Sequence, residues 1–244
     1  MEQLAVAVWR LASSTAEQFR AALVGEWAPL ACEHEGLDDL TLNFAAPDQG
    51  IYARPPGPDG LTSMVDAFVM LGLAQAHDLD DLPGRDELYR LARRVDVWRV
   101  RTDHPKAYAR EWPDGTEAPG VKLVSFMRRA DAMNHEQFVR HWTERHTPLA
   151  LEHHVGLWDY RQHVVRRAYT PGGRDVDGIA ELHFETRADF DEKFFDSDAG
   201  RKVIMDDVAR FMGRPTGGSG LMIELPILSA FDGRGALRPG RLVE

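Results

Sequence analysis

Four residues with chemically useful side chains lie close together on a predicted helix in the second half of the chain: His141, Trp142, Arg145 and His146. Histidine titrates near neutral pH and can take a proton from an activated carbon or return one to a leaving hydroxyl. Arginine can stabilise the oxyanion formed in such a step. We therefore expect His146 and His141 to be catalytic, and Trp142 and Arg145 to bind the substrate. The alternatives are core packing for Trp142 and capping of the helix end for His146.

Two predicted strands supply further candidates, because alternate residues of a strand share a face. Within residues 157–167, Arg161 and His163 share one face and Tyr160 lies on the other; within 176–185, Glu181 and His183 share a face. Charged strand faces are usually solvated, but a covered His or Glu must be hydrogen-bonded or line a cavity. We expect His183 to be catalytic. The further residues expected to bind the substrate are Tyr160, His163, Glu181 and His154.

The sequence predicts neither a cofactor nor a metal site. It has a single cysteine, Cys32, and no His-x-x-x-His helical pair, so the usual zinc ligand patterns are missing. It also lacks a glycine-rich nucleotide fingerprint before a helix and a Gly-x-Ser-x-Gly elbow. A site of histidines and carboxylates from different strands, or a haem-ligating histidine, stays open as a minor alternative.

These candidates sit on one copy of an internal repeat. Residues 4–34 align without a gap on residues 123–153, and ten of the 31 positions are identical. The polar helix residues of the second copy replace Ala22, Leu23, Glu26 and Trp27 of the first. Residues shared by both copies, such as His34 and His153, indicate scaffold. Unshared polar residues indicate function, and this favours the second copy as the site.

Strand and helix signals recur in the same order in both halves. The first half predicts strands at 6–10, 40–45, 65–74 and 95–101, with helices at 15–32 and 86–94. The first helix is predicted to begin at Ser14, in a capping box with Glu17, and to bend at Pro29. The second half predicts strands at 121–129, 157–167, 176–185 and 221–228, with a helix at 135–153, capped by Asn134, and one at 188–212, in two pieces around Gly200.

Each half therefore reads as β-α-β-β-α-β, the ferredoxin-like arrangement. One such unit leaves an apolar sheet face bare, which two units in one chain can cover. We predict an α+β fold in which two ferredoxin-like repeats pack sheet to sheet as an intramolecular α+β barrel. The expected segments are a degenerate repeat (1–101), a linker (102–119), a second repeat (120–228) and an extended C-terminal tail (229–244).

Composition narrows the possible partners. The net charge is −10, which argues against nucleic acid, because phosphate binding needs a basic surface. The arginines at 161, 166 and 167 are interpreted as solvating an exposed strand end. No apolar run is long enough for a membrane span, and no signal peptide is visible. We expect a cytoplasmic protein that binds a hydrophobic small molecule, as a monomer (a pseudo-dimer) or a homodimer.

The second half resembles a known family. Residues 121–129 end in Arg128-Arg129, and the following helix carries Phe138-x-x-x-Trp142-x-x-x-His146 and then Pro148-Leu149. This pattern resembles the EthD domain of the dimeric α+β barrel superfamily over residues 120–228, and the repeat extends a weaker resemblance to the first half. There Trp27 stands at the position of the motif histidine, so a first-half pocket is not expected.

The resemblance implies a broad set of activities, including cofactor-free isomerases, polyketide cyclases, dehydratases, small monooxygenases and haem-dependent enzymes. We favour a cofactor-independent enzyme of lyase or isomerase type. It would use histidine acid/base chemistry to isomerise, cyclise or dehydrate a hydrophobic carbonyl-bearing or aromatic molecule. The alternatives are a non-catalytic binding or accessory domain and an oxygenase of the same superfamily. Fold resemblance alone does not choose among them.

Overall fold

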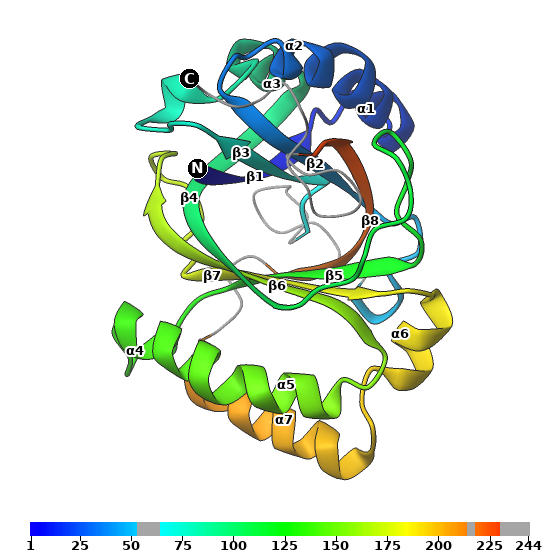
Figure 1. Ribbon diagram of the computed structural model, residues 1–244. Helices are drawn as coiled ribbons and strands as arrows, with labels where there is room; N and C mark the ends of the chain where they lie inside the picture. The colour runs from blue at the N-terminus through cyan, green and yellow to red at the C-terminus, as the bar shows by residue number, and fades with distance from the viewer. Residues whose placement is uncertain (53–63, 214–217, 230–244) are drawn as a thin grey trace.

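Eight antiparallel strands close into a barrel with helices packed outside it, as the computed structural model of residues 1–52, 64–213 and 218–229 shows (Figure 1). The strands are β1 (Glu2–Arg10), β2 (Leu37–Ala45), β3 (Ala67–Leu73), β4 (Ala92–Lys106), β5 (Val121–Met127), β6 (Leu157–Ala168), β7 (Gly178–Phe184) and β8 (Ser219–Leu228). The α-helices are α1 (Ala16–Ala22), α2 (Ala28–Cys32), α3 (Arg85–Leu91), α4 (His135–Arg140), α5 (Thr147–His153), α6 (Arg187–Lys193) and α7 (Asp198–Phe211). Two short 3₁₀ turns are η2 (Gly50–Tyr52) and η3 (Leu79–Asp81).

The order around the barrel is β1-β3-β2-β8-β5-β7-β6-β4, and β4 pairs back with β1. The strands of each half occupy one continuous arc. The two arcs are joined by hydrogen-bonded pairs, β2 with β8 and β4 with β6. The α+β barrel expected within one chain is therefore present. Its halves meet edge to edge as well as face to face, so pairing covers strand edges that would otherwise attract other chains.

Helix starts follow the repeat. Asn134 caps α4 as predicted, in a capping box with Gln137. The first helix differs from the prediction, because Thr15 rather than Ser14 is its cap, with Gln18 as the box partner. The hydroxyl of Ser14 instead donates to the Leu11 carbonyl in the preceding turn. Both copies thus begin this helix in the same way, 119 residues apart.

The bends expected at the two helix prolines are π-helical turns. These turns are η1 (Leu23–Trp27) and η4 (His141–His146), and each lies just before a proline-containing helix. In η4 the Thr147 N–H donates to the carbonyl of Trp142, five residues back. Proline cannot donate along a helix, so a local change of hydrogen-bonding pattern at this point is expected. The turn widens the helix where His141, Trp142 and His146 sit.

Among the boundaries that differ from the predictions, two change how a segment is assigned. Strand β4 continues to Lys106, because residues 102, 103 and 106 pair with β6, so the predicted linker begins as strand. The break in the last helical region lies before Gly200. Helix α6 ends at Lys193, and α7 starts after Ser197, whose hydroxyl accepts from the Gly200 N–H. The predicted tail lies outside the described residues beyond position 229, as do residues 53–63 between the predicted strands at 40–45 and 65–74.

Three apolar clusters make up the core. One packs the first-half helices on the barrel and contains Leu23 and Trp27. A second packs the second-half helices on it and contains Trp142 and Tyr160. The third, with Phe68 among its members, lies inside the barrel. Within the described part of the chain, no helix is both long and apolar enough to cross a membrane.

Candidate active site

Strand alternation brings charged side chains into the barrel. On β7, Ala180 and Leu182 belong to the helix-side cluster, whereas Ile179 belongs to the interior cluster. Glu181 and His183 therefore face the interior with Ile179. Each is at most 1% exposed. The neighbouring strands place further polar residues beside them, so the barrel interior combines an apolar region with a charged one.

Lys122 is the centre of the charged region. Its ammonium group donates hydrogen bonds to the carboxylates of Glu181 and Glu224, and the Lys122 side chain is fully buried. The second oxygen of Glu181 accepts from His163 Nε2 at 2.7 Å. His163 Nδ1 lies 2.7 Å from the hydroxyl of Thr102, on the part of β4 that was expected to be linker.

The buried charges stabilise one another against a large desolvation cost. Burial by itself disfavours each charged form. Lys122 outweighs this and holds the pKa of Glu181 well below its usual range; together with Arg161 it lowers the pKa of Glu224 to about 2. Burial would likewise lower the pKa of Lys122, but the two carboxylates raise it. Breaking such a cluster costs far more than its intact form contributes.

Arg161 extends the network to Asp159. Its guanidinium pairs with Asp159 at 3.1 Å and lies 3.7 Å from Glu224. His104, on β4, reaches the other oxygen of Asp159 at 2.6 Å. The prediction that Arg161 solvates an exposed strand end is therefore wrong, because alternation along β6 turns it into the barrel. Counting Lys122, the network holds two permanent cations and three carboxylates.

His183 borders this network and an aromatic cluster made of Tyr108, Trp112 and Trp158. Tyr108 stacks on Trp158 with ring centroids 4.3 Å apart and on Trp112 at 5.4 Å. The rings of Tyr108 and Trp158 meet His183 edge-on at 5.8 and 5.4 Å. The Tyr108 hydroxyl donates to Glu224 at 3.0 Å, and burial, then Glu224, raises the pKa of this phenol.

Three side-chain atoms of this region are buried without a hydrogen-bond partner among the described residues: His183 Nδ1, Trp112 Nε1 and Asp159 Oδ2, of which the last is ion-paired with Arg161. His183 Nε2 lies 2.9 Å from the Pro119 carbonyl, which can only accept, so Nε2 carries the hydrogen. Burial, and then Lys122, lower the pKa of His183 and favour the neutral ring. Its Nδ1 then presents a free lone pair, and Trp112 presents a free N–H donor.

His141 and His146 lie on the other side of the sheet, in the helix layer formed by α4, α5 and α7 (Figure 1). They share the carboxylate of Asp207 on α7, at 2.9 Å from His141 Nε2 and 3.1 Å from His146 Nδ1. Both rings pack on Phe211, with centroids 5.0 Å away. Burial lowers the pKa of His146, against the opposing effect of Asp207. This cluster fixes η4 to α7.

Trp142 and Tyr160 also meet in the helix layer. The Trp142 indole donates to the Tyr160 hydroxyl at 3.0 Å, and Gln162 donates to the same oxygen at 2.9 Å. Burial raises the pKa of Tyr160 to about 12. Arg145 is exposed. His154 is buried against Phe194, whose carbonyl lies 2.6 Å from His154 Nδ1, and burial lowers the pKa of His154 to about 4.

The structure thus separates the predicted site residues into two groups. His163, Glu181 and His183 lie inside the barrel; the helix layer holds His141, His146, Trp142, Tyr160 and His154, and Arg145 lies at the surface. The three histidines expected to be catalytic do not share one site. No group of three or more His, Cys, Asp or Glu side chains is arranged to hold a metal ion within residues 1–52, 64–213 and 218–229.

Several residues of the interior site were not found from the sequence. Lys122 and Glu224 are the one charged residue of β5 and of β8, at positions in phase with inward-facing Val124 and Met222. A lone charge at an inward position was the available signal for both. Tyr108 and Trp112 lie in the predicted linker, where no periodic pattern marks a direction, so only the fold identifies them.

Comparison with known proteins agrees with this architecture. Residues 130–215 match the EthD domain. The whole chain is similar in fold to an anthrone oxidase-like protein, with a TM-score of 0.54 and 12% identity over 94% of this chain and 95% of the other. It is also similar to a mutant chlorite dismutase from Candidatus Nitrospira defluvii, with a TM-score of 0.50 and 14% identity over 93% and 92% of the two chains.

The structure is a closed α+β barrel for which one chain supplies every strand, and its fold is similar to that of these solved structures. At these identities the solved structures establish the fold alone. No curated protein is similar enough in sequence to count as a relative.

Proposed function

We propose that this protein is a small-molecule enzyme that moves a proton on a hydrophobic carbonyl-bearing or aromatic substrate, with His183 as the base. The observation that carries the proposal is the buried, unpartnered Nδ1 of His183 in a ring held neutral. Perturbed titratable groups in buried sites are typical of catalytic centres. This reading keeps the histidine chemistry predicted from the sequence and assigns it to the barrel interior.

The surrounding groups suit such a reaction. The stacked rings of Tyr108 and Trp158 offer an apolar surface for a flat substrate. The free N–H of Trp112 can donate to a substrate oxygen as negative charge develops there. His183 Nδ1 takes a proton from the carbon next to the carbonyl, and an enolate forms. The proton then returns to another carbon, which isomerises the substrate, or to a hydroxyl that leaves as water.

The charged network sets the electrostatics of this step. Lys122 lowers the pKa of His183 and so keeps its lone pair available at neutral pH. Tyr108 is held by Glu224, which Lys122 in turn holds ionised. We assign these residues positioning and electrostatic roles, because none needs to touch the reacting carbon. Catalytic roles for His141 and His146 stay predictions, and the proposal does not require them.

We also propose that the barrel arose as two ferredoxin-like repeats. The strand order within each half, β4-β1-β3-β2 and β8-β5-β7-β6, supports this, as do the matched caps at Thr15 and Asn134. The first copy fills its helix layer with Leu23 and Trp27, where the second has Trp142 and His146. Apolar filling in the first copy is consistent with a single site in the second half.

The test is deuterium exchange at the α-carbon of a panel of aromatic ketones and 1,3-diketones in D₂O, followed by NMR. Wild-type protein should accelerate exchange for at least one member of the panel. His183→Gln should reduce the rate by about 100-fold or more, in the range of general-base contributions. His77→Gln, which changes an exposed histidine, is the matched control and should keep the wild-type rate.

Three results would count against the proposal. Unchanged exchange in His183→Gln refutes the assigned base. Loss of exchange in a His141→Gln/His146→Gln double variant, with His183→Gln unaffected, would transfer catalysis to the helix layer. Binding of panel members without exchange in any variant would identify a binding domain. Oxygen consumption should be recorded in the same samples, because uptake with substrate would identify the oxygenase alternative.

A further inference from the structure

Asp159 on β6 lies directly opposite His183 on β7. It is in phase with inward-facing Arg161, so both paired side chains lie on the interior face of the barrel, where their Cβ atoms are about 5 Å apart. Each carries a buried atom without a hydrogen-bond partner in the described part of the chain, Oδ2 of Asp159 and Nδ1 of His183. In the neutral ring both atoms are acceptors, so neither can satisfy the other.

Proton uptake by His183 changes this relation. When Nδ1 takes a proton it becomes a donor, and Asp159 Oδ2 is the free acceptor at the paired position of the next strand. Nε2 keeps its hydrogen bond to the Pro119 carbonyl, so the ring does not have to reorient. The charged ring therefore has an acceptor for each of its two N–H groups, whereas the neutral ring leaves one atom of each residue without a partner.

The other charged groups around His183 are already engaged. Lys122 on β5 donates to Glu181, on the same strand as His183, and to Glu224 on β8. The second oxygen of each of these glutamates accepts from another side chain, a histidine for Glu181 and a tyrosine for Glu224. Among the carboxylates of the network, within the residues that the structure describes, Asp159 alone has an oxygen that accepts no hydrogen bond.

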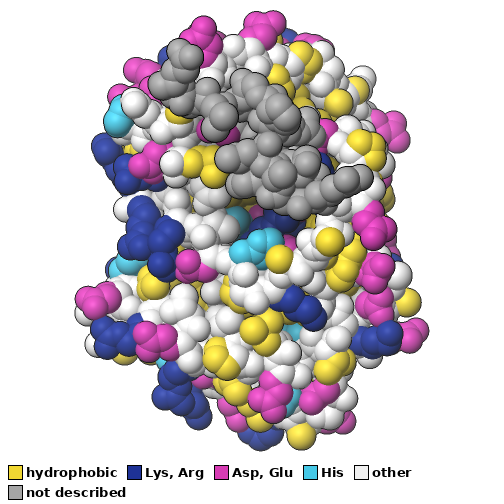
Figure 2. Space-filling model, viewed as in Figure 1, with side chains coloured by type: hydrophobic (Ala, Val, Ile, Leu, Met, Phe, Trp, Pro, Cys, Tyr) yellow, Lys and Arg dark blue, Asp and Glu magenta, His cyan; other side chains and the backbone are white. Residues whose placement is uncertain are grey.

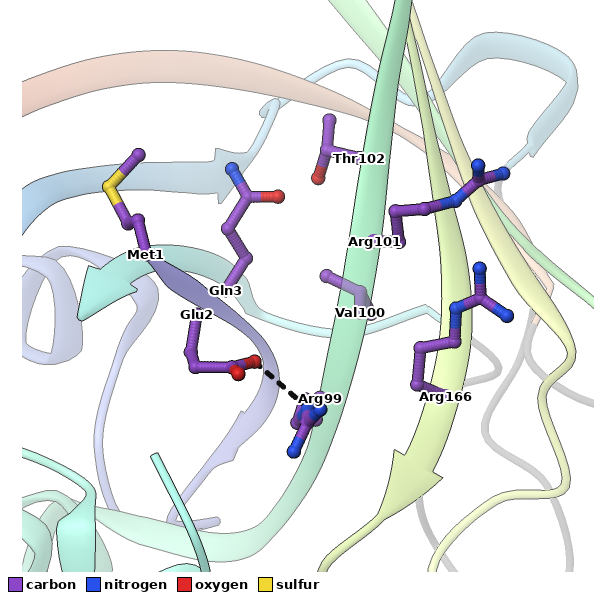
Figure 3. A pocket seen from close by; sticks show the side chains of 8 residues that line it. All are labelled: Met1, Glu2, Gln3, Arg99, Val100, Arg101, Thr102 and Arg166. Carbon is purple, nitrogen blue, oxygen red and sulfur yellow. Dashed lines mark ion pairs between the residues drawn. The ribbon is translucent and has the colours of Figure 1, made fainter. Parts of the chain in front are cut away.

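Two side chains hold the Asp159 carboxylate in place. Arg161 pairs with Oδ2 at 3.1 Å, and His104 Nε2 lies 2.6 Å from Oδ1. Figure 3, a close view of a pocket beside β4, shows Thr102 and Arg101 on opposite sides of that strand. His104 follows Thr102 in phase, which places it on the interior side with Asp159. The carboxylate is thus oriented before any proton moves.

A carboxylate inside the barrel acts on His183 more strongly than charges at the surface do. On the face shown in Figure 2 acidic and basic side chains are interspersed, and salt screens exposed charges from one another. Asp159 is fully buried, and an opposite charge within about 4–6 Å moves a pKa toward the charged form by about 1–3. Burial and Lys122 lower the pKa of His183, and Asp159 acts in the opposite direction.

We propose that Asp159 is the counter-ion of His183 and stabilises the imidazolium that forms when Nδ1 takes a proton from the substrate. The proton moves from the substrate carbon to Nδ1 and later leaves from Nδ1, and none passes to the carboxylate. Asp159 is a positioning residue, because it acts through His183. Its use in catalysis rests on the proposed function, but its interaction with the charged ring can be tested without a substrate.

The test is an NMR pH titration of His183 in the full chain labelled at histidine. Asp159→Asn keeps the shape of the side chain and removes its charge, so the pKa of His183 should fall by about 1 or more, a tenfold loss of proton affinity. Asp177→Asn is the matched control, because Asp177 is also buried and also pairs with one arginine and one histidine. It lies six residues from His183, about 20 Å along the strand, and should leave that pKa unchanged.

An unchanged or raised pKa of His183 in Asp159→Asn would overturn the proposal. So would a wild-type ring that stays neutral down to acid unfolding, because Asp159 would then fail to make the charged form attainable. In the α-carbon exchange assay Asp159→Asn should slow exchange at least tenfold, and an unchanged rate would refute its role in catalysis. If His183→Gln exchanges like the wild type, the proposed base is wrong, while the titration still decides whether Asp159 stabilises the charged ring.

Discussion

Replacing Lys122 with methionine removes the one ammonium group that Glu181 and Glu224 share inside the barrel. Methionine keeps the length of the side chain, so the change mainly leaves two carboxylates without their central partner. Removing one partner from a buried ion pair typically costs about 3–5 kcal/mol. We expect Lys122→Met to lose this amount at pH 7 in urea unfolding followed by tryptophan fluorescence.

The pH dependence of the free energy of unfolding provides a second, independent test of this prediction. In the wild type, Glu224 has a folded pKa of about 2, against an ordinary value of 4.5. A carboxyl with a lowered folded pKa contributes stability above its unfolded pKa, and the contribution disappears as pH falls from about 5 toward 2. The difference corresponds to about 3 kcal/mol. In Lys122→Met the two buried carboxylates lose the ammonium group that offsets their desolvation. Protonating them at lower pH removes this unfavourable charge and therefore stabilises the variant.

The stability gap between wild type and Lys122→Met should therefore shrink between pH 7 and pH 4. Lys202→Met is the matched control, because Lys202 is exposed and its one ion-pair partner among the described residues is Asp206 on the same helix. That control should stay within about 0.5 kcal/mol of the wild type. A Lys122→Met gap below about 1 kcal/mol at pH 7, or a gap that widens on acidification, would refute the reasoning about the network.

Three further predictions concern the helix layer. Gly178→Ala places a Cβ 2.5 Å from the Trp142 ring and should lower the free energy of unfolding in urea by about 1–3 kcal/mol. Gly25→Ala is the control, because the space around Gly25 is open, and it should not destabilise the protein. Equal effects of the two substitutions would contradict the packing of Gly178 against Trp142. Asp207→Asn removes the group that opposes the burial effect on His146, so the pKa of His146 should fall further in an NMR titration, and a rise would disprove the shared carboxylate. Asn134→Ala and Thr15→Ala should each cost about 1 kcal/mol, and Ser14→Ala clearly less; the reverse order would contradict the assigned caps.

Much of the fold is predictable from the sequence because its signals are local. The repeat, the Asn134 cap and the proline positions give the order of elements and the place of the helix bends. The end of β4 is not predictable in this way, because residues 102–106 become strand only through pairing with β6. The start of α1 shows the same limit on a smaller scale, because Ser14 and Thr15 are both good caps and the preceding turn decides between them.

The candidate site likewise has a part that local sequence pattern predicts and a part that only the fold reveals. Alternation places Arg161, His163, Glu181 and His183 on shared faces, and that grouping needs no tertiary information. Which face is the barrel interior depends on how eight strands close. Tyr160 was expected to bind the substrate together with His163 and Glu181, but it lies in the helix layer, on the opposite face of β6 from His163. Partners such as Glu224, 102 residues from Lys122, come together only in the closed barrel.

The most direct test of the central claim is the protonation state of His183 at neutral pH. Long-range ¹⁵N–¹H NMR correlations of histidine-labelled protein, assigned with His183→Gln, distinguish the two neutral tautomers and the charged ring. The account predicts a neutral ring at pH 7 with hydrogen on Nε2 and a bare Nδ1, as the contact with the Pro119 carbonyl requires. A charged ring, or hydrogen on Nδ1 alone, would contradict it, because His183 would then have no lone pair with which to act as the base.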